Sequence, residues 1–310
     1  MTRPKITSIG DFVIDKSLST SGMSSVHVGH LPAQPTYKVA IKLHLESETH
    51  HNTFQDYLRK EADYLVRFRH PSVIRIFPIS LHTGKVSYCV RATNLPENPW
   101  YFAMEYLPGG DLSDYIKKIK TFPILWIIEF FYQLLITVQF LHHLGFGHCD
   151  LKPDNILLRE PPEPNKSPQP ILTDFGTTHP LGTPITQPAK SVRYSPPEIL
   201  LAHTRKDIHP QELALYPDKI DIWSLGAILF ELLTGRPLFN QKQDREITTS
   251  ILEGKIDKIR TLRPEVNESL DVVLEQMLKR VPEARPEVDE LIVAFEELIS
   301  SVRPPRIPVA

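Results

Sequence analysis

The sequence predicts an α+β fold in which a small β-rich half with one helix precedes a larger, mainly helical half. In residues 9–45, apolar and polar side chains alternate around turn-forming clusters, which is the period of a half-buried strand. After Pro108-Gly109-Gly110, apolar side chains recur every three or four positions, which is the period of an amphipathic helix. We therefore place a hinge at about 105–110, between the two halves.

The first half is predicted to contain five strands and one helix. The helix covers 52–69, because its apolar positions recur at helical spacing, and His70-Pro71 stops it. We expect a long loop over 80–100, where the turn-rich string NLPENP lies. Such insertions are usually exposed to solvent. The predicted strands are 12–18, 25–29, 38–44, near 73–79, and 101–105.

The second half is predicted to be a set of helices joined by loops. Its most apolar segment, 123–143, is interrupted by Glu129, Gln133 and Gln139. A membrane span needs about 20 apolar residues with few or no charges, so we interpret this segment as a buried core helix. The segments 160–170 and 201–219 are interpreted as two further long loops. The predicted helices are 112–119, 123–143, 220–234, 245–253, 269–279 and 287–300.

Composition excludes several classes of protein. With 310 residues, 41% apolar and 23% charged, the chain is long enough to bury a core and is not mostly disordered. A net charge of −2 provides no basic field for nucleic acid. Two cysteines cannot form a disulfide framework or a Cys-rich metal site. The N-terminal residues have no apolar run, so we expect a soluble, cytoplasmic protein without a membrane segment.

Two strings carry the chemistry. HCDLKPDNILL covers 148–158 and TDFG covers 173–176. One carboxylate can take a proton from a hydroxyl, while an Asn and a second Asp offer the hard oxygen ligands that Mg²⁺ prefers. A base beside Mg²⁺ is the arrangement that phosphoryl transfer needs, because that reaction depends on positioning and on charge neutralisation.

These strings resemble the catalytic loop and magnesium loop of eukaryotic-type Ser/Thr protein kinases, and the resemblance extends from about residue 9 to 299. It implies a two-lobed protein-kinase-like fold over 9–300, with a small antiparallel β N-lobe and a larger helical C-lobe, followed by a proline-rich tail at 301–310. It also implies the site roles. Asp150 would be the catalytic base and Lys152 the cation at the γ-phosphate, while Asn155 and Asp174 would bind Mg²⁺.

The string VAIK, 39–42, resembles the strand that carries the lysine for the α- and β-phosphates of ATP. That lysine would be Lys42, and Glu61, nineteen positions later, would hold it. The string MEYLPGGDL, 104–112, resembles the segment that meets the adenine and ribose. The ATP-binding residues that the resemblance implies are Leu18, Ser19, Ser21, Gly22, Ser24, Val26, Ala40, Lys42, Met104, Glu105, Leu107, Asp111 and Leu157.

The sequence departs from the family pattern in two places. The phosphate-covering loop reads LSTSGMSSV over 18–26, with serines where three glycines are usual, so we expect a stiffer loop. Its Gly-Met-Ser piece is similar to bacterial members of the family. Cys149 replaces the arginine that usually precedes the catalytic Asp, which is the non-RD subtype. We therefore expect activity that does not depend on phosphorylation of the loop between Asp174 and Glu198.

Four supporting contacts are implied by the resemblance. Glu198 should pair with Arg285, and Asp221 should brace the backbone of the catalytic loop. Ser191 should contact the catalytic Asp and Lys. Finally, an apolar column of stacked side chains should form, in which the histidine is a packing residue and not a base. Its members are Leu65, Ile76, His148 and Phe175.

The implied activity is transfer of the γ-phosphoryl group of Mg-ATP to a Ser or Thr hydroxyl of a protein substrate. The alternative is a pseudokinase that binds ATP, or nothing, and acts as a scaffold; the serine-rich loop is its only support. A small-molecule phosphotransferase is disfavoured by the segment from Ser191 to Glu198 and by Arg285. Regulation would come through the Lys42–Glu61 pair, the long loops or a partner protein.

Overall fold

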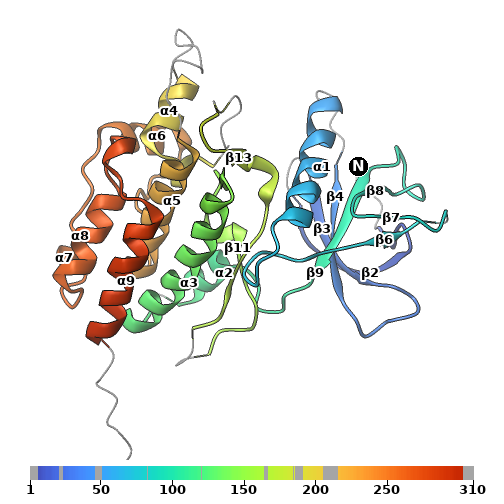
Figure 1. The fold of residues 1–310 in the computed structure, drawn as a ribbon, viewed down its shortest axis with the longest axis horizontal. Coiled ribbons are helices and arrows are strands. Elements are labelled where there is room, and N and C mark those ends of the chain that lie inside the picture. Colours follow the sequence, from blue (N-terminus) through green and yellow to red (C-terminus); the bar gives the residue numbers. More distant parts are fainter. Residues whose placement is uncertain are drawn as a thin grey trace, which may run out of the picture. The chain divides into compact units, whose positions relative to one another are not determined.

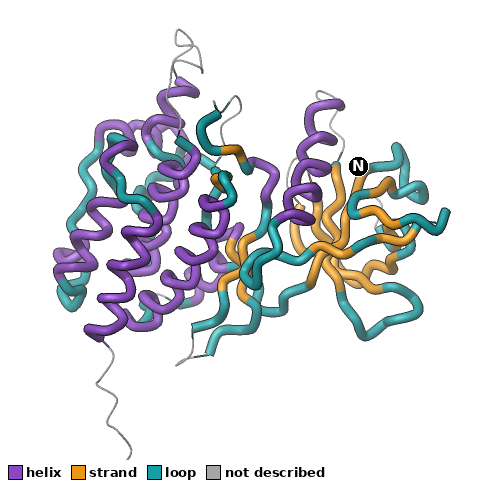
Figure 2. The backbone as a smooth tube through the Cα atoms, viewed as in Figure 1, coloured by secondary structure: helices purple, strands orange, loops and turns teal. Residues whose placement is uncertain are grey.

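The computed structural model describes residues 6–20, 24–45, 51–81, 83–119, 121–163, 167–183, 185, 191–204 and 216–302, without the side chains of 51–56, 203 and 204. The chain forms two compact units, residues 1–107 and 108–310. The boundary between them falls within the segment 105–110 that was predicted to be a hinge. The predicted fold class is confirmed, since a β-rich unit with one helix precedes a helical unit (Figure 2).

The first unit is built on an antiparallel sheet with the strand order β1-β2-β3-β4-β9-β5, and β8 pairs with β9 beside β5 (Figure 1). β6 and β7 form a separate hairpin. The strands are β1 (Ser8–Ile9), β2 (Phe12–Thr20), β3 (Ser24–His30), β4 (Val39–His44), β5 (Ile76–Phe77), β6 (Ile79–Ser80), β7 (Val86–Ser87), β8 (Val90–Arg91) and β9 (Trp100–Glu105).

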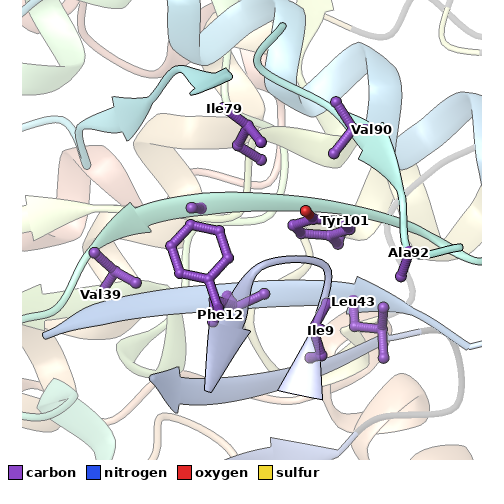
Figure 3. Packing of buried hydrophobic residues seen from close by; sticks show 10 residues of the cluster. Ile9, Phe12, Val39, Leu43, Ile79, Val90, Ala92 and Tyr101 are labelled. Atoms are coloured by element: carbon purple, nitrogen blue, oxygen red, sulfur yellow. The ribbon is translucent and has the colours of Figure 1, made fainter. Parts of the chain in front are cut away.

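Strand alternation separates the packing face of this sheet from the face that carries Lys42. Val39, Ile41 and Leu43 of β4 belong to one buried apolar cluster, together with Tyr101 of β9 (Figure 3). Because successive side chains on a strand point to opposite faces, Lys42 lies on the other face of β4. The alternation of side chains along β4 thus places Lys42 on the face of the sheet opposite the apolar cluster.

The segment 80–100 was predicted to be an exposed loop, and this prediction was wrong. It contains β7 and β8, and β8 pairs with β9 through Val90 and Tyr101. Val90 and Ala92 are buried in the cluster of Figure 3. These strands have two residues each, which is too short for an alternation pattern to be visible in the sequence. The turn-rich string is a real turn, with positive φ angles at Glu97 and Asn98.

The helix of the first unit, α1 (His51–Arg67), ends three residues before His70, close to the predicted position. Its buried residues include Leu58, Ala62 and Leu65 at helical spacing, which form the face that contacts β4, β5 and β9. Glu61 lies on this inner side and is only 2% exposed. A carboxylate is rarely buried to this extent unless it is paired, so its position calls for a cation.

The second unit is mainly helical. α3 is long and apolar enough to cross a membrane by length and composition alone. Most of its apolar residues are buried, and it packs against α5 and α9. The helices are α2 (Leu112–Lys118), α3 (Ile124–His143), α4 (Pro197–Thr204), α5 (Pro217–Thr234), α6 (Asp244–Glu253), α7 (Ile259–Leu262), α8 (Glu268–Met277) and α9 (Val288–Val302) (Figure 1).

Three of these helices differ from the prediction. α5 begins at Pro217, three residues earlier than expected, because proline is well tolerated in the first turn of a helix. α4 and α7 were not predicted, since segments of eight and four residues are too short for a periodic pattern. This unit also contains two small antiparallel sheets of two strands each. They pair β10 (Phe146–Gly147) with β13 (His179–Pro180) and β11 (Ile156–Leu158) with β12 (Pro170–Leu172).

Candidate active site

A buried ion pair joins β4 to α1. The Lys42 ammonium donates to both carboxylate oxygens of Glu61, at 2.8 and 2.7 Å. The two residues are 9% and 2% exposed. Burying a single charge is costly, so each side chain stabilises the other in this place. The predicted pair is confirmed, and it fixes the lysine on the face of the sheet opposite the apolar cluster.

Several of the other nucleotide-binding residues predicted in the first unit lie on strands of its sheet. Val26 of β3 is the register partner of Lys42, and Ala40 of β4 is the partner of Met104 on β9. Glu105 is engaged, because its side chain accepts a hydrogen bond from the backbone N–H of Arg75 at 3.0 Å. Of the remaining residues, Leu18, Ser19 and Ser24 lie at the ends of β2 and β3, Leu107 is buried, and Ser21 and Gly22 lie outside the described residues.

In the second unit, Asp111 has a structural function that was not predicted from the sequence. Its carboxylate accepts a hydrogen bond from the backbone N–H of Asp114 at 2.8 Å and so caps the N-terminus of α2. Burial raises the pKa of Asp111, although the capping bond opposes this shift. Asp111 also forms a β-bridge with Leu157, which is another of the predicted ATP-binding residues.

The centre of the site is Asp150. Its Oδ2 accepts hydrogen bonds from the Lys152 ammonium at 2.7 Å and from the Asn155 amide at 3.2 Å. The same amide donates to the Asp150 carbonyl at 2.8 Å. The other carboxylate oxygen, Oδ1, is buried and has no hydrogen-bond partner among the described residues. An unpaired buried oxygen on a carboxylate costs free energy, and a bound hydroxyl that donates to it would remove that cost.

The two predicted metal ligands are brought close together by the β11–β12 hairpin. The backbone N–H of Thr173 donates to the carbonyl of Asn155 at 3.1 Å, so Asp174 follows directly on a residue bonded to Asn155. Asp174 has a φ of 65°, a left-handed conformation that is uncommon outside glycine. The NH₂ group of Asn155 is occupied by Asp150, which leaves the amide oxygen for a cation. Amide and carboxylate oxygens are suitable donors for Mg²⁺.

Asp221 fixes the backbone of the catalytic loop by hydrogen bonds, as predicted. Its two carboxylate oxygens accept the N–H groups of His148 and Cys149, each at 2.8 Å. A third contact was not predicted: the ring of His142 lies 3.0 Å from Asp221 Oδ2. Two neighbouring histidines on a helix point in different directions, so one of them can face the core. Only the fold shows that this histidine is His142 and that its partner is Asp221. Cys149 has a φ of 64°, and the two bonds to Asp221 hold this strained turn in place.

His148 is a packing residue, which confirms that part of the prediction. Its ring centroid lies 4.9 Å from that of Phe175, and its Nε2 lies 3.0 Å from the carbonyl oxygen of Thr173. Within the second unit this contact links the catalytic loop to the segment that carries Asp174. Leu65 and Ile76, the other two members of the predicted column, are both buried in the first unit.

The thiol of Cys149 is buried. The residue is 5% exposed, and burial raises the pKa of the thiol well above its usual value, with the carboxylate of Asp221 adding to the shift. A thiol in this state is inert, because the thiolate is the reactive form. Cys149 therefore provides neither a charge nor a nucleophile beside Asp150.

Several hydroxyl groups after Asp174 have hydrogen-bond partners, whereas the buried hydroxyl of Thr178 has none among the described residues. Ser191 accepts a hydrogen bond from the Lys152 ammonium at 2.9 Å, so the predicted contact with the lysine is confirmed. Thr177 donates to the carbonyl of His148 at 3.1 Å. Thr178 is completely buried. Arg193 donates to the carbonyls of Phe239 and Gln241.

We expect turnover to be independent of phosphorylation of this loop. A phosphate orders a loop only where cations can pair with it, and Cys149 provides no cation. Phosphatase treatment, and separately the substitution of Thr177, Thr178, Thr183 and Thr186 by Ala, should each leave turnover within about threefold, since the residue before Asp150 is Cys149, which needs no phosphate to neutralise it. Thr186 and Lys190 lie outside the described residues. A loss of turnover under both treatments, with the circular dichroism spectrum unchanged, would contradict the prediction.

The model of the protein kinase domain family matches residues 21–294. The chain belongs to this family. The matched range includes Lys42 and Glu61 of the first unit and Asp150, Asn155 and Asp174 of the second. The identification therefore agrees with the geometry of both units.

The similar proteins found are serine/threonine-protein kinases. The chain is 26% identical over 277 residues to the kinase ULK3 of Xenopus laevis, a match that covers 89% of this chain and 53% of that protein. It is 28% identical over 257 residues to the SNF-related kinase of Rattus norvegicus, covering 82% and 30%. It is 28% identical over 247 residues to the ovarian-specific kinase Lok of Drosophila melanogaster, covering 76% and 45%. The kinase domain thus spans about half, or less, of these relatives.

Proposed function

We propose that this kinase domain transfers the γ-phosphoryl group of Mg-ATP to Ser or Thr hydroxyls of protein substrates. The family and the names of the relatives support this activity. The single observation that carries the proposal is the carboxylate of Asp150. One of its oxygens is fixed by Lys152 and Asn155, while the other is buried without a partner among the described residues.

The two oxygens of Asp150 have different functions in this proposal. Oδ2 is an acceptor for an ammonium and an amide, and these bonds fix the plane of the carboxylate. Oδ1 accepts the proton of the substrate hydroxyl, which orients the hydroxyl oxygen for attack on phosphorus. Positioning of this kind supplies much of the rate in phosphoryl transfer, because the transition state asks for little covalent chemistry from the protein.

Cations balance the charge of the transferred group. Lys152 is held between Asp150 and Ser191, which places an ammonium beside the attacking hydroxyl. Lys42 would meet the α- and β-phosphates, and Glu61 keeps its ammonium in position. Mg²⁺ would be held by Asn155 and Asp174 and, when bound, would neutralise charge on the phosphate oxygens.

The pseudokinase alternative would require a defect in this set, and the described residues show none. Lys42 is paired, Asp150 is held, and the amide oxygen of Asn155 is left for a cation. The serine-rich string 18–26 was the only support for the alternative, and part of it lies outside the described residues. No observation here favours it.

The test is phosphotransfer from radiolabelled Mg-ATP to a generic protein substrate, with Asp174→Ala measured beside the parent chain. We expect label on Ser or Thr with the parent chain and none above background with the variant. The labelled residues are identified by acid hydrolysis. Equal labelling by the two proteins would refute the proposed activity, and label found only on tyrosine would refute the acceptor class.

A second experiment measures binding without catalysis. ATP should raise the unfolding temperature weakly without Mg²⁺ and more strongly with it, because a ligand that binds only the native state adds stability by mass action. At a concentration 100 times the dissociation constant, this stabilisation is about 2.7 kcal/mol. Asp174→Ala should remove the part of the shift that depends on Mg²⁺. An identical pair of shifts in parent and variant would show that Asp174 does not hold the metal.

A further inference from the structure

A cavity of about 420 Å³ lies between α3 and α9 in the second unit. These two helices pack side by side (Figure 1). α3 contributes Glu129 and Tyr132 to the lining, and α9 contributes Glu296, Ile299 and Ser300. The volume falls in the range of about 300–1,000 Å³ that is usual for binding sites. None of the described lining residues belongs to the catalytic loop or to the predicted metal ligands, so the cavity is separate from the candidate active site.

The lining of this cavity carries negative charge. Two of its described residues, Glu129 and Glu296, are carboxylates, and none is a lysine, an arginine or a histidine. Glu296 is exposed, and its Oε1 accepts a hydrogen bond from the hydroxyl of Tyr132 at 2.9 Å. The described part of the chain provides no cation that forms an ion pair with Glu296. A cavity lined by charge of one sign attracts a ligand of the opposite sign, so this cavity suits a cationic segment.

The segment that follows α9 in the sequence has the matching charge. Residues 303–310 read RPPRIPVA, with two arginines, three prolines and no acidic side chain. Its proline content favours the polyproline II conformation over a helix. That conformation has three residues per turn, so Arg303 and Arg306 would lie on one face and could reach two carboxylates together. Proline-rich segments also bind against aromatic rings, and Tyr132 provides such a ring in the cavity.

Helical spacing places the start of this segment beside the cavity. Glu296, Ile299 and Ser300 are three and four positions apart, so they form one stripe along α9. The next position of that stripe is 303, which directly follows Val302, the last residue of α9. The segment that carries the two arginines therefore begins next to the carboxylate of Glu296 and needs no long connection to reach it.

Tethering favours this segment over a segment of another protein. An ion pair at the surface strengthens an interaction by up to about fivefold, so two such pairs give a free peptide only weak affinity. The same contacts suffice for a tethered segment, because its effective concentration is in the millimolar range. We propose that residues 303–306 bind in the cavity of their own chain, with the arginines paired to Glu129 and Glu296 and the prolines against Tyr132. The bound segment would tie α9 to α3 and fix the direction in which the chain leaves the kinase domain.

The test is photo-crosslinking within the full chain, without ATP. Benzoylphenylalanine is introduced in place of Ile307, beside Arg306, and mass spectrometry of the digested protein identifies the joined peptides. We expect a crosslink within one chain to the peptide of α3 that contains residues 129–133. Arg303→Gln/Arg306→Gln and, separately, Glu296→Gln should each lower the yield of this crosslink by about threefold or more, since each removes a surface ion pair.

Two matched pairs of variants control this experiment. Glu297→Gln removes the next exposed carboxylate of α9, which is not among the lining residues, and should change the yield by less than about twofold. Ser300→Arg places a competing guanidinium in the cavity and should lower the yield, whereas Ser301→Arg, outside the lining, should not. This second pair leaves the bond between Tyr132 and Glu296 intact, so it tests the site even if Glu296→Gln alters the packing.

Three results would overturn the proposal. The first is the absence of a crosslink to α3. The second is an equal loss of yield in Glu296→Gln and Glu297→Gln, which would show general electrostatic attraction rather than a site. The third is a crosslink that forms only between two chains, seen as a band of twice the mass on a denaturing gel, because the segment of a second copy would then occupy the cavity.

Discussion

Substitution of Asp150 by Asn should lower turnover by about 10²- to 10⁴-fold while leaving the fold intact, which is the usual range for losing a positioned base. Asn has nearly the same size and shape, so the bonds from Lys152 and Asn155 can still reach an oxygen at this position. What is lost is the charge on Oδ1, the buried oxygen that has no partner among the described residues. The neutral amide cannot accept a proton from a hydroxyl.

Asp289→Asn is the control, because it removes an exposed carboxylate far along the sequence, on α9. Steady-state phosphotransfer gives the turnover of both variants, and the thermal shift with Mg-ATP gives their nucleotide binding. We expect Asp150→Asn to bind Mg-ATP and Asp289→Asn to behave as the parent chain. Wild-type turnover in Asp150→Asn would show that the carboxylate is not the base.

The sequence predicted the parts of the site that depend on chemistry in a fixed local order. HCDLKPDN and TDFG are continuous strings, so the order of residues alone was enough to single out Asp150, Asn155 and Asp174. The Lys42–Glu61 pair joins distant positions, yet it follows from one strand, one helix and their expected contact. Lys42 and Glu61 are residue types that are costly to bury without a partner, and each occurs on the buried side of a regular element.

The sequence did not predict features that arise from close packing. His142 gives no local sign that Asp221 is its neighbour, because 79 positions separate them. β8 has two residues, which cannot show an alternation, although Val90 and Ala92 are part of the core. The partner-free oxygen of Asp150 is also a property of the folded chain, since it depends on which of the described groups surround it. Local patterns carry no information of this kind.

Gly109 shows how packing constrains the backbone beside the site. A Cβ at this position would lie 2.3 Å from the carbonyl oxygen of Leu158 and 2.5 Å from that of Glu160. Only glycine allows the backbone at position 109 to run this close to the end of β11. The string Pro108-Gly109-Gly110 suggested a turn from the sequence alone, whereas the structure shows that Gly109 is required by close approach and Gly110 by its φ of 73°.

The largest effect on stability is expected at the pair of Glu198 and Arg285. Both nitrogens of the guanidinium end donate to the carboxylate, at 2.7 and 2.8 Å, and Arg285 also donates to the carbonyl of Lys219 at 2.8 Å. The guanidinium lies over the ring of Trp223, 5.1 Å from its centroid. The two charged residues are 8% and 2% exposed. Removing one partner leaves the other charge buried and unpaired.

Arg285→Met should therefore lower the free energy of unfolding by about 3–5 kcal/mol, the cost of breaking a buried pair. In the corresponding exposed pair, Arg236 lies 3.2 Å from Asp257, and Arg236→Met should cost no more than about 1 kcal/mol. The double variant Arg285→Met/Glu198→Gln removes the unpaired charge and should recover part of the loss. Urea unfolding measures all three. Equal free energies of unfolding for Arg285→Met and Arg236→Met would show that burial does not determine the free energy lost when the ion pair is broken. The double variant removes the unpaired charge of Glu198 but does not restore the packing of Arg285 on Trp223. The part of the free energy of unfolding that it recovers therefore measures the effect of the unpaired carboxylate.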